Sequence, residues 1–337
     1  MKVTILIVIA LWSVMLVACG GEPATPTPEP PTPTPAATPT PIPTPTPPAG
    51  DHIKAGIDSF EQGKLDEAIG EFEKALELEP DNPDAYRNLG AVYAEQSNWE
   101  EAAAAYEQAI SLAPDFGEAY GDLAAVYNSL ERPADAVIAG EKAIELVPDY
   151  FSAHNNLGNA YKRQGRFDEA VVEYQTAIQL DPQDGKPHYN LGLLYAMQGD
   201  LADAIAEWKE AIRLQPDYAS AYGNLGLAYI YLGRLDEAVA ACQKGVEFQP
   251  DAANIHNTLG LAYYKQDKNE DAVAEWRETI RLDPNHADAH KNMGIAYAEQ
   301  DQKDEAIAEW EIYLQLIPPD APDRAKVAGW IAQLKGQ

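Results

Sequence analysis

The chain has 337 residues, and its 54 aspartates and glutamates outnumber its 24 lysines and arginines, which gives a formal net charge of −30 at pH 7. Phosphate backbones and anionic lipid headgroups repel such a chain, so the composition argues against a nucleic-acid partner and against flat adsorption to a membrane. We expect a neutral or basic partner. The simpler interpretation is that the charge is a solvated outer face that keeps a long protein soluble.

Residues 1–18 contain one basic residue, Lys2, and then an apolar stretch that is short for a membrane span and has no charged flank on its far side. The stretch ends in Leu16-Val17-Ala18-Cys19-Gly20, which resembles the lipobox of bacterial lipoproteins. The resemblance implies a signal peptide over 1–18, cleavage before Cys19, and acyl chains such as palmitate on Cys19. These chains would be the only contact with the bilayer, on the extracytoplasmic side of the bacterial cell envelope. An uncleaved membrane anchor is the alternative, and it gives the same topology.

Residues 19–50 are dominated by Thr-Pro and Pro-Thr pairs, and half of the 26 prolines lie between Pro23 and Pro48. Proline fixes φ and removes a backbone donor, so this composition excludes helix and sheet and predicts a polyproline II stalk. At about 3.1 Å per residue, about 30 residues reach roughly 90 Å when fully extended. The segment therefore predicts a spacer between the lipid anchor and the rest of the chain.

The remaining chain repeats with one strict period of 34 residues. Prolines mark the period at Pro80, Pro114, Pro148, Pro182, Pro216, Pro250, Pro284 and Pro318. In the same register lie the small residues Gly56, Gly90, Ala124, Gly158, Gly192, Gly226, Gly260 and Gly294. Neither a helix nor a strand has a natural period of this length, so the repeating unit is supersecondary.

Inside each unit the apolar spacing is helical, as residues 151–184 illustrate. Leu157 and Tyr161 fall on one face of a first helix, and Ala170 and Tyr174 fall on one face of a second. Gly165 lies between the two helices as the turn. A proline ends the second helix, since it cannot continue the hydrogen-bond ladder. The sequence thus predicts a helix-turn-helix unit whose small residues lie where the two helices cross.

The first helix of each unit reads like Ala221-Tyr222-Gly223-Asn224-Leu225-Gly226-Leu227-Ala228-Tyr229. This pattern resembles the tetratricopeptide repeat family closely. The resemblance implies an all-α fold, a right-handed superhelical solenoid of eight repeats over 49–320 whose first helices line the concave side. The repeats are 49–82, 83–116, 117–150, 151–184, 185–218, 219–252, 253–286 and 287–320.

Two residues depart from this repeat pattern, and one further segment follows the last repeat. Gly140 and Cys242 stand where other repeats have Phe, Tyr or Trp, so we expect these two units to pack less tightly. The segment 321–337 places Val327, Trp330, Ile331 and Leu334 on one helical face, which predicts a C-terminal capping helix.

No motif for catalysis or metal binding emerges. Five of the six histidines, His52, His154, His188, His256 and His290, share one repeat position with Tyr86, Tyr120 and Tyr222. This exchange favours a packing role, and equivalent positions on packed helices lie on the order of 10 Å apart, too far to share a metal. No glycine-rich phosphate loop, nucleophile elbow or paired-cysteine zinc motif occurs. We expect no metal, no cofactor and no enzymatic activity.

Asparagines recur two residues before the repeat glycines, at Asn88, Asn156, Asn190, Asn224 and Asn292. In superhelical members of the tetratricopeptide repeat family, a ladder of this kind holds the backbone of an extended peptide, because an amide offers both a donor and an acceptor. Beyond the glycines, an apolar patch is expected from Leu193, Met197, Leu227, Ile230, Tyr231, Leu261 and Tyr264. Alternatively, asparagine is simply frequent at this position, and some of the apolar residues pack against adjacent helices.

These features predict a membrane-anchored extracytoplasmic scaffold that binds a protein or peptide and assists assembly of an envelope complex. A mechanical or self-associating envelope spacer is the alternative. The first helices also resemble the repeats of O-linked N-acetylglucosamine transferases, but no catalytic domain follows here, so a glycosyltransferase role is not expected.

Overall fold

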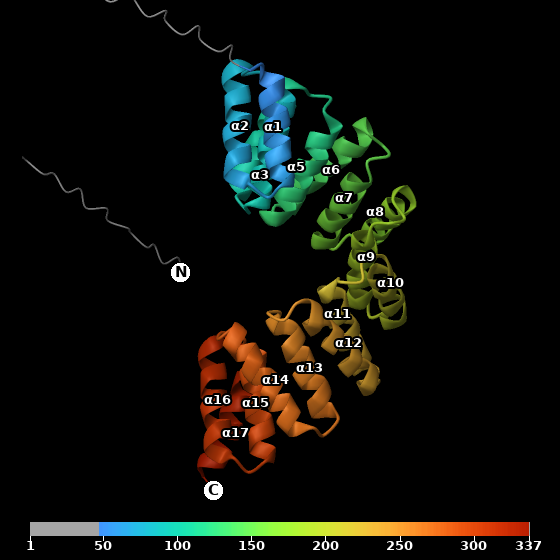
Figure 1. Cartoon of the computed structure of the whole chain (residues 1–337). Coiled ribbons are helices and arrows are strands. Elements are labelled where there is room, and N and C mark those ends of the chain that lie inside the picture. Colours follow the sequence, from blue (N-terminus) through green and yellow to red (C-terminus); the bar gives the residue numbers. More distant parts are fainter. Residues whose placement is uncertain (1–46, 337) are drawn as a thin grey trace, which may run out of the picture. The chain divides into compact units, whose positions relative to one another are not determined.

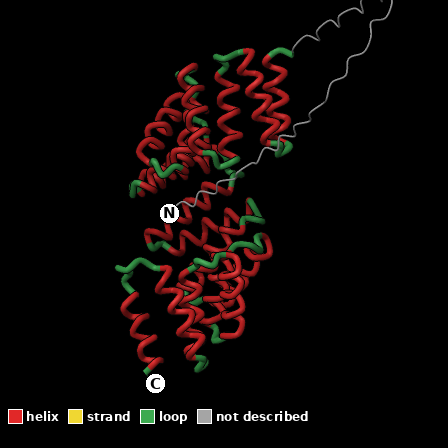
Figure 2. The backbone as a smooth tube through the Cα atoms, turned by 90° about the vertical axis from the view of Figure 1, so that its left-hand side faces the viewer, coloured by secondary structure: helices red, strands yellow, loops and turns green. Residues whose placement is uncertain are grey.

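Every regular element of the described chain is an α-helix. The computed structural model describes residues 47–336, and within them seventeen helices and no strands occur (Figures 1 and 2). The expected all-α solenoid of helical repeats is confirmed. The expected signal peptide over 1–18, the lipidated Cys19 and residues 19–46 of the expected stalk lie outside the described residues.

The helices alternate between the first and the second helix of each repeat. The odd-numbered helices begin 34 residues apart and are α1 (Ala49–Glu61), α3 (Pro83–Glu95), α5 (Gly117–Ser129), α7 (Phe151–Arg163), α9 (Gly185–Gln198), α11 (Ala219–Tyr231), α13 (Ala253–Lys265) and α15 (Ala287–Glu299). Their partners are α2 (Leu65–Leu78), α4 (Trp99–Leu112), α6 (Pro133–Leu146), α8 (Phe167–Leu180), α10 (Leu201–Leu214), α12 (Leu235–Phe248), α14 (Asn269–Leu282) and α16 (Lys303–Leu316).

The turn between the two helices of each repeat uses a residue in the left-handed region. Gly165, between α7 and α8, has a φ of 74°, which glycine adopts without steric cost. Four of the turns place a residue other than glycine in this region, namely Ser97, Glu131, Asp267 and Asp301. The shared conformation gives every repeat the same short helix–helix connection.

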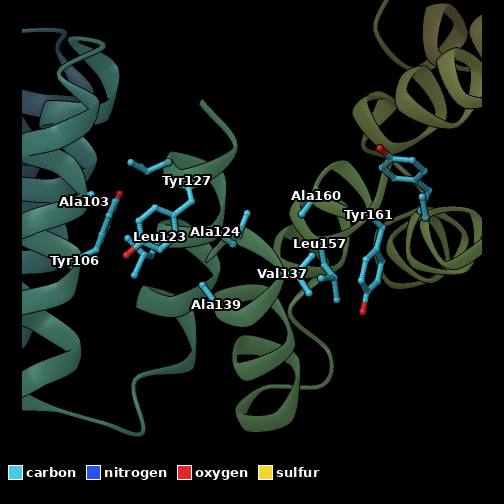
Figure 3. Packing of buried hydrophobic residues seen from close by; sticks show 14 of the residues in the cluster. Ala103, Tyr106, Leu123, Ala124, Tyr127, Val137, Ala139, Leu157, Ala160 and Tyr161 are labelled. Carbon is cyan, nitrogen blue, oxygen red and sulfur yellow. The ribbon is translucent and has the colours of Figure 1, made fainter. Parts of the chain in front are cut away.

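Small residues let the two helices of a repeat touch. A Cβ atom added to Gly158 on α7 would lie 2.7 Å from the ring of Tyr174 on α8, which is too close for any side chain. Ala170 on α8 is fully buried in the same core cluster. Figure 3 shows this cluster, in which Val137 comes from α6 and Leu157 and Tyr161 come from α7 of the next repeat. The core is thus continuous from one repeat to the next.

Each repeat packs against its immediate neighbours in the sequence. Every even-numbered helix contacts the odd-numbered helix that follows it, and odd-numbered helices also contact one another. Within residues 47–336, successive even-numbered helices make no comparable contact. The odd-numbered helices therefore line one face of the stack, which is the arrangement that positions the candidate site.

The expectation of looser packing around Gly140 and Cys242 is wrong. Successive odd-numbered helices contact each other most extensively between α5 and α7 and between α11 and α13, in the repeats that carry these two residues. A Cβ atom on Gly140 would lie 3.1 Å from Leu157 of the next repeat, and Cys242 packs with Leu259. Since no ring occupies this position, the following repeat lies closer and fills the space.

The last helix, α17 (Arg324–Lys335), covers the end of the stack by packing on α16. Val327 and Ile331 are buried, and Trp330 and Leu334 pack against the same core cluster. The predicted capping helix is therefore confirmed. Of the helices in residues 47–336, none is both long enough and apolar enough to cross a bilayer.

Candidate peptide-binding groove

Two neighbouring pockets lie on the face of the odd-numbered helices, one on each side of α9. The first, which we call the polar pocket, is lined by Ala125, Asn128, Ser129, Asn156, Asn159, Lys162, Arg163 and Asn190. The second, which we call the apolar pocket, is lined by Leu193, Ala196, Met197, Leu201, Trp208, Asn224, Leu227, Ala228 and Tyr231. Their volumes are about 500 Å³ and about 270 Å³. Because α9 contributes to both pockets, they form one groove from α5 to α11.

Three asparagines of the polar pocket each donate one side-chain hydrogen bond within the protein. Asn156 donates from Nδ2 to the carbonyl of Gly121 at 3.1 Å, and Asn190 donates to Oδ1 of Asn155 at 2.9 Å. Asn128 donates to the carbonyl of Asn156 at 2.8 Å. These bonds tie each helix to its neighbour and fix the amide planes. The Oδ1 acceptors of Asn156 and Asn190 and the second Nδ2 hydrogen of each of these two side chains are left for a ligand.

Asn128 is the most constrained of these side chains. It is only 7% exposed, and within residues 47–336 its Oδ1 atom is buried without a hydrogen-bond partner. A buried acceptor without a partner costs free energy, so such groups call for a physical explanation. Because this oxygen is buried, a bound molecule could reach it only after the side chain moves.

The same pocket holds two cations. Lys162 is half-buried on α7 beside Arg163, and its ammonium lies 5.9 Å from the centre of the Tyr174 ring. Burial, together with the charge of Arg163, lowers the pKa of Lys162 to about 8. Within the described residues, no carboxylate lies within 4.0 Å of either cation. The pocket is thus a positively charged site on a strongly acidic protein.

The apolar pocket opens where successive odd-numbered helices touch least, between α9 and α11. Here the ring of Tyr189 packs at 4.7 Å from the ring of Tyr218, and Asn224 donates to the Tyr189 hydroxyl at 3.1 Å. At the mouth of the pocket, Met197 is 61% exposed and Tyr231 is 72% exposed. Side chains this apolar and this exposed offer a surface that a partner can cover.

Some of the predicted site residues lie in the groove, and others lie outside it. Asn156 and Asn190 lie in the polar pocket, and Asn224, Leu193, Met197, Leu227 and Tyr231 lie in the apolar pocket. Asn88, Asn292, Leu261 and Tyr264 are half-buried outside both pockets, and Leu261 packs against two core clusters. The Tyr264 hydroxyl donates to Glu299 at 2.6 Å.

Ile230 requires a correction. It is only 6% exposed and belongs to the core cluster that α9, α11 and their neighbours share. Ile230 is the last residue but one of α11, and its side chain lies in this core cluster, which includes Ala262 of the following repeat, instead of lining the groove. Ile230 therefore cannot contact a bound peptide.

Six residues of the polar pocket were missed from the sequence, among them the polar side chains of Asn128, Asn159 and Lys162. A signal for them exists. Counted from the first residue of each odd-numbered helix, Asn159 is at position 9, where the other seven repeats have alanine, leucine or isoleucine. Asn128 and Lys162 are at position 12, where the other six repeats have alanine, isoleucine, phenylalanine or tyrosine. Polar residues thus replace apolar ones only around this pocket.

The five histidines of the shared position pair with glutamates instead of lining the groove. Nδ1 of each histidine lies 2.6–2.7 Å from a glutamate Oε2 in the same repeat, in the pairs His52–Glu71, His154–Glu173, His188–Glu207, His256–Glu275 and His290–Glu309. Where the histidine is replaced by tyrosine, the glutamate is replaced by alanine, in the pairs Tyr86–Ala105, Tyr120–Ala139 and Tyr222–Ala241. This joint exchange indicates a structural pair inside each repeat.

Neither a metal centre nor a reactive thiol is found in the described part of the chain. Residues 47–336 contain no group of three or more His, Cys, Asp or Glu side chains placed to hold a metal ion. Cys242 is buried, and burial raises the pKa of its thiol to about 12, so the thiolate is scarce at neutral pH. The chemistry of the groove is therefore that of hydrogen bonds, charge and apolar contact.

Comparison with known sequences gives a consistent family. A family model described as TPR repeat matches residues 58–97, 141–165, 158–199, 194–231, 226–267 and 260–301. A second, described as tetratricopeptide repeat, matches residues 83–116. No curated protein sequence matches the chain.

Three solved structures show similarity. A chain of the APC/C hetero-tetramer Cut9–Hcn1 is similar at 17% identity and a TM-score of 0.66, over 80% of this chain and 52% of that chain, so this chain spans about half its length. A tetratricopeptide repeat protein from Parabacteroides merdae ATCC 43184 is similar at 18% identity and a TM-score of 0.57, over 74% and 98% of the two chains. YrrB, a TPR protein with an unusual peptide-binding site, is similar at 24% identity and a TM-score of 0.44, over 56% and 96%. The first two structures show the fold.

Proposed function

Because the chain belongs to the tetratricopeptide repeat family, whose members generally act as non-catalytic scaffolds, we propose that it binds a protein or extended peptide and catalyses no reaction itself. The observation that carries the proposal is the groove from α5 to α11, where the polar and the apolar pocket meet at α9. A surface that offers amide acceptors beside exposed apolar side chains suits a polypeptide.

The proposal extends to the cellular setting. Cys19 and the preceding apolar stretch support a lipid anchor in a bacterial envelope, and the Pro/Thr-rich segment supports a spacer that lifts the repeats from the membrane. On such an anchor, a peptide-binding solenoid would assist the assembly of an envelope complex. The net charge of −30 favours a partner that is neutral or basic over most of its surface.

Substitution of the ladder asparagines tests the proposed function. Asn190→Ala together with Asn224→Ala removes one ladder residue from each pocket, and Asn292→Ala is the matched control because it changes the same repeat position outside both pockets. Binding of fluorescent neutral peptides to the full-length protein is measured by anisotropy. We expect about thirtyfold weaker binding for the double variant and no change for the control, since each of the two lost hydrogen bonds contributes about 1 kcal/mol.

Equal affinity of the double variant and the unchanged protein would remove the asparagine ladder from the proposal. Absence of binding by any peptide to the unchanged protein would overturn the proposed function itself. Crosslinking in cells followed by mass spectrometry would then identify the molecules that contact this protein.

A further inference from the structure

Two apolar side chains are exposed on the even-numbered helices, outside the groove. Ile138 on α6 is 67% exposed and Val172 on α8 is 57% exposed, more than any other large apolar side chain of the even-numbered helices. Each is the sixth residue of its helix. The other six even-numbered helices have glycine or alanine at this position, namely Gly70, Ala104, Ala206, Ala240, Ala274 and Ala308. Two successive repeats therefore carry an exception at the same place.

The fold does not require these two large side chains. The buried residues Ala136, Gly140 and Ala143 share one face of α6, and Ile138 lies on the opposite face of that helix. A β-branched side chain also has a lower helix propensity than alanine. Ile138 and Val172 thus weaken their helices without packing into the core, and side by side on one surface they indicate a contact with another molecule.

A further pocket adjoins Ile138. It has a volume of about 360 Å³ and is lined by Tyr120 of α5 and by Ile138, Glu141, Lys142 and Glu145 of α6. Glu141 accepts a hydrogen bond from the Tyr161 hydroxyl at 2.8 Å through Oε1, so that its Oε2 atom is left to accept another. Glu145 is exposed even though it pairs with Lys142 at 3.0 Å. We call Val172 and the five lining residues the outer patch.

The charge around the outer patch is negative. Together, α6 and α8 contain six aspartates and glutamates and one lysine or arginine, Lys142. Arg132 and Arg166 precede the two helices and pair with one acid each, so an excess of carboxylates remains. Such a surface repels anionic lipid headgroups and a second copy of this acidic chain, and it attracts a cationic partner. A polypeptide that is both apolar and basic therefore complements the outer patch.

We infer that the outer patch binds a basic amphipathic segment of a partner protein. Apolar side chains of this segment cover Ile138 and Val172, whose equivalent positions in packed repeats lie on the order of 10 Å apart, about two turns of one partner helix. A lysine or arginine of the segment enters the adjoining pocket, where it lies against the Tyr120 ring and beside Glu141 and Glu145. The inference goes beyond the proposed function, because this site is separate from the groove.

The test uses the full-length protein and a fluorescent peptide of leucine and lysine arranged as an amphipathic helix. Matched peptides have glutamine in place of lysine, or serine in place of leucine. By anisotropy at low ionic strength, we expect the leucine–lysine peptide to bind at least about tenfold tighter than either match, because it alone meets both the apolar and the charged requirement.

Ile138→Ala together with Val172→Ala should weaken binding of the leucine–lysine peptide by about tenfold. This double variant carries the residue that most of the other repeats have at the same position, so it should fold normally, which thermal unfolding verifies. Met197→Ala is the matched control, because it removes an apolar side chain that is 61% exposed in the groove instead. It should leave the affinity for this peptide unchanged.

The charged part of the outer patch has a matched control in the repeat 219–252. There Lys244 pairs with Glu247 as Lys142 pairs with Glu145, but Ala240 stands at the position of Ile138. Glu145→Gln should weaken binding of the leucine–lysine peptide by about threefold, and Glu247→Gln should not change it.

Several results would overturn the inference. They are the absence of binding by the leucine–lysine peptide, equal binding of the glutamine match, and binding that survives Ile138→Ala with Val172→Ala. Self-association of the protein that this double variant abolishes would also overturn it, because a second copy would then cover the outer patch. Weaker binding in Met197→Ala would place the peptide in the groove. The proposed function is independent of these results, since it is measured with neutral peptides and variants of the groove.

Discussion

The polar and the apolar pocket are built on the same backbone and differ at a few positions of the repeat. Asn159, Lys162 and Arg163 on α7 occupy the places that Leu193, Ala196 and Met197 occupy on α9. The residues that join the helices are alike in the two regions, since Gly158 and Ala170 in one correspond to Gly192 and Ala204 in the other. The comparison teaches that one set of repeat positions determines the fold and another, on the groove face, determines what the surface can bind.

The largest expected effect is a loss of folding stability, caused by a substitution at the helix crossing of either region. Ala170→Leu and Ala204→Leu each place a large side chain at a fully buried helix crossing. Each substitution should lower the free energy of unfolding by about 1–3 kcal/mol through overpacking, as measured by urea denaturation. Ala202→Leu, on an exposed position of α10, is the control and should change stability by less than about 0.5 kcal/mol. Unchanged stability in either buried variant would contradict this placement of the crossing.

The second prediction separates the two regions by pH. A protonated Lys162 attracts the glutamate of a bound peptide but not the glutamine of a matched peptide, and the pKa of Lys162 is about 8. Among the side chains around it, burial raises the pKa of Tyr174 well above this range, and the lining asparagines and Ser129 do not titrate. Raising the pH from 7 to 9 should therefore weaken binding of a glutamate peptide by up to about tenfold.

Binding of the matched glutamine peptide, which uses the apolar pocket without the charge, should be unaffected by the same pH change. Anisotropy titrations at the two pH values measure both constants. A glutamate peptide that binds equally well at pH 9 would show that the charge of Lys162 does not contribute to peptide binding.

A third prediction converts one region into the other. Asn159→Leu with Lys162→Ala gives the polar pocket the residues that α9 has at the same positions. The change removes a half-buried cation, but it also leaves the buried Tyr174 hydroxyl without the Asn159 Oδ1 atom that accepts its hydrogen bond at 2.8 Å. We expect the two effects to oppose each other, so that the free energy of unfolding changes by less than about 1 kcal/mol, while any preference for a glutamate peptide over a glutamine peptide is lost. Denaturation and peptide titration of the same variant check both effects, and a loss of stability would show that these side chains support the fold.

The fold could be predicted from sequence because its signals recur eight times. The period of the prolines and small residues fixes the helix pairs, and a single departure such as Ser97 in a left-handed turn does not obscure it. The effect of Gly140 could not be predicted, because it depends on how closely the next repeat approaches and hence on contacts with Leu157. Sequence periodicity within one helix does not report the space between helices.

The groove was predictable in part for a related reason. The ladder asparagines follow the repeat, so the period reveals them, whereas Asn159 and Lys162 depart from it and carry the local chemistry. Ile230 was misplaced because residues at the end of an odd-numbered helix alternate within one turn between the groove and the next repeat. The comparison between equivalent positions of all eight repeats would have separated these cases.

The last prediction concerns a pair that both regions share and that should therefore affect neither pocket. Each pocket is bordered by a repeat with a histidine–glutamate pair and by a repeat with tyrosine and alanine at the same positions. His154→Tyr alone or Glu173→Ala alone leaves one member without its partner, while the double variant reproduces the combination found at Tyr120 and Ala139. We expect both single variants to be destabilised and the double variant to recover, with a coupling energy of at least about 0.5 kcal/mol.

The pH dependence of that coupling tests its origin. The hydrogen bond with Glu173 raises the pKa of His154, so the folded state holds the proton more tightly than the unfolded state does. The stabilisation from this pair is then fully present below the ordinary histidine pKa and is lost as the pH rises through the folded-state pKa. Denaturation at pH 6 and pH 8 should show the larger coupling at pH 6, with peptide affinity unchanged in the double variant. A change of affinity would mean that the helix pairs and the groove are not independent, which would undo the separation of fold positions from binding positions.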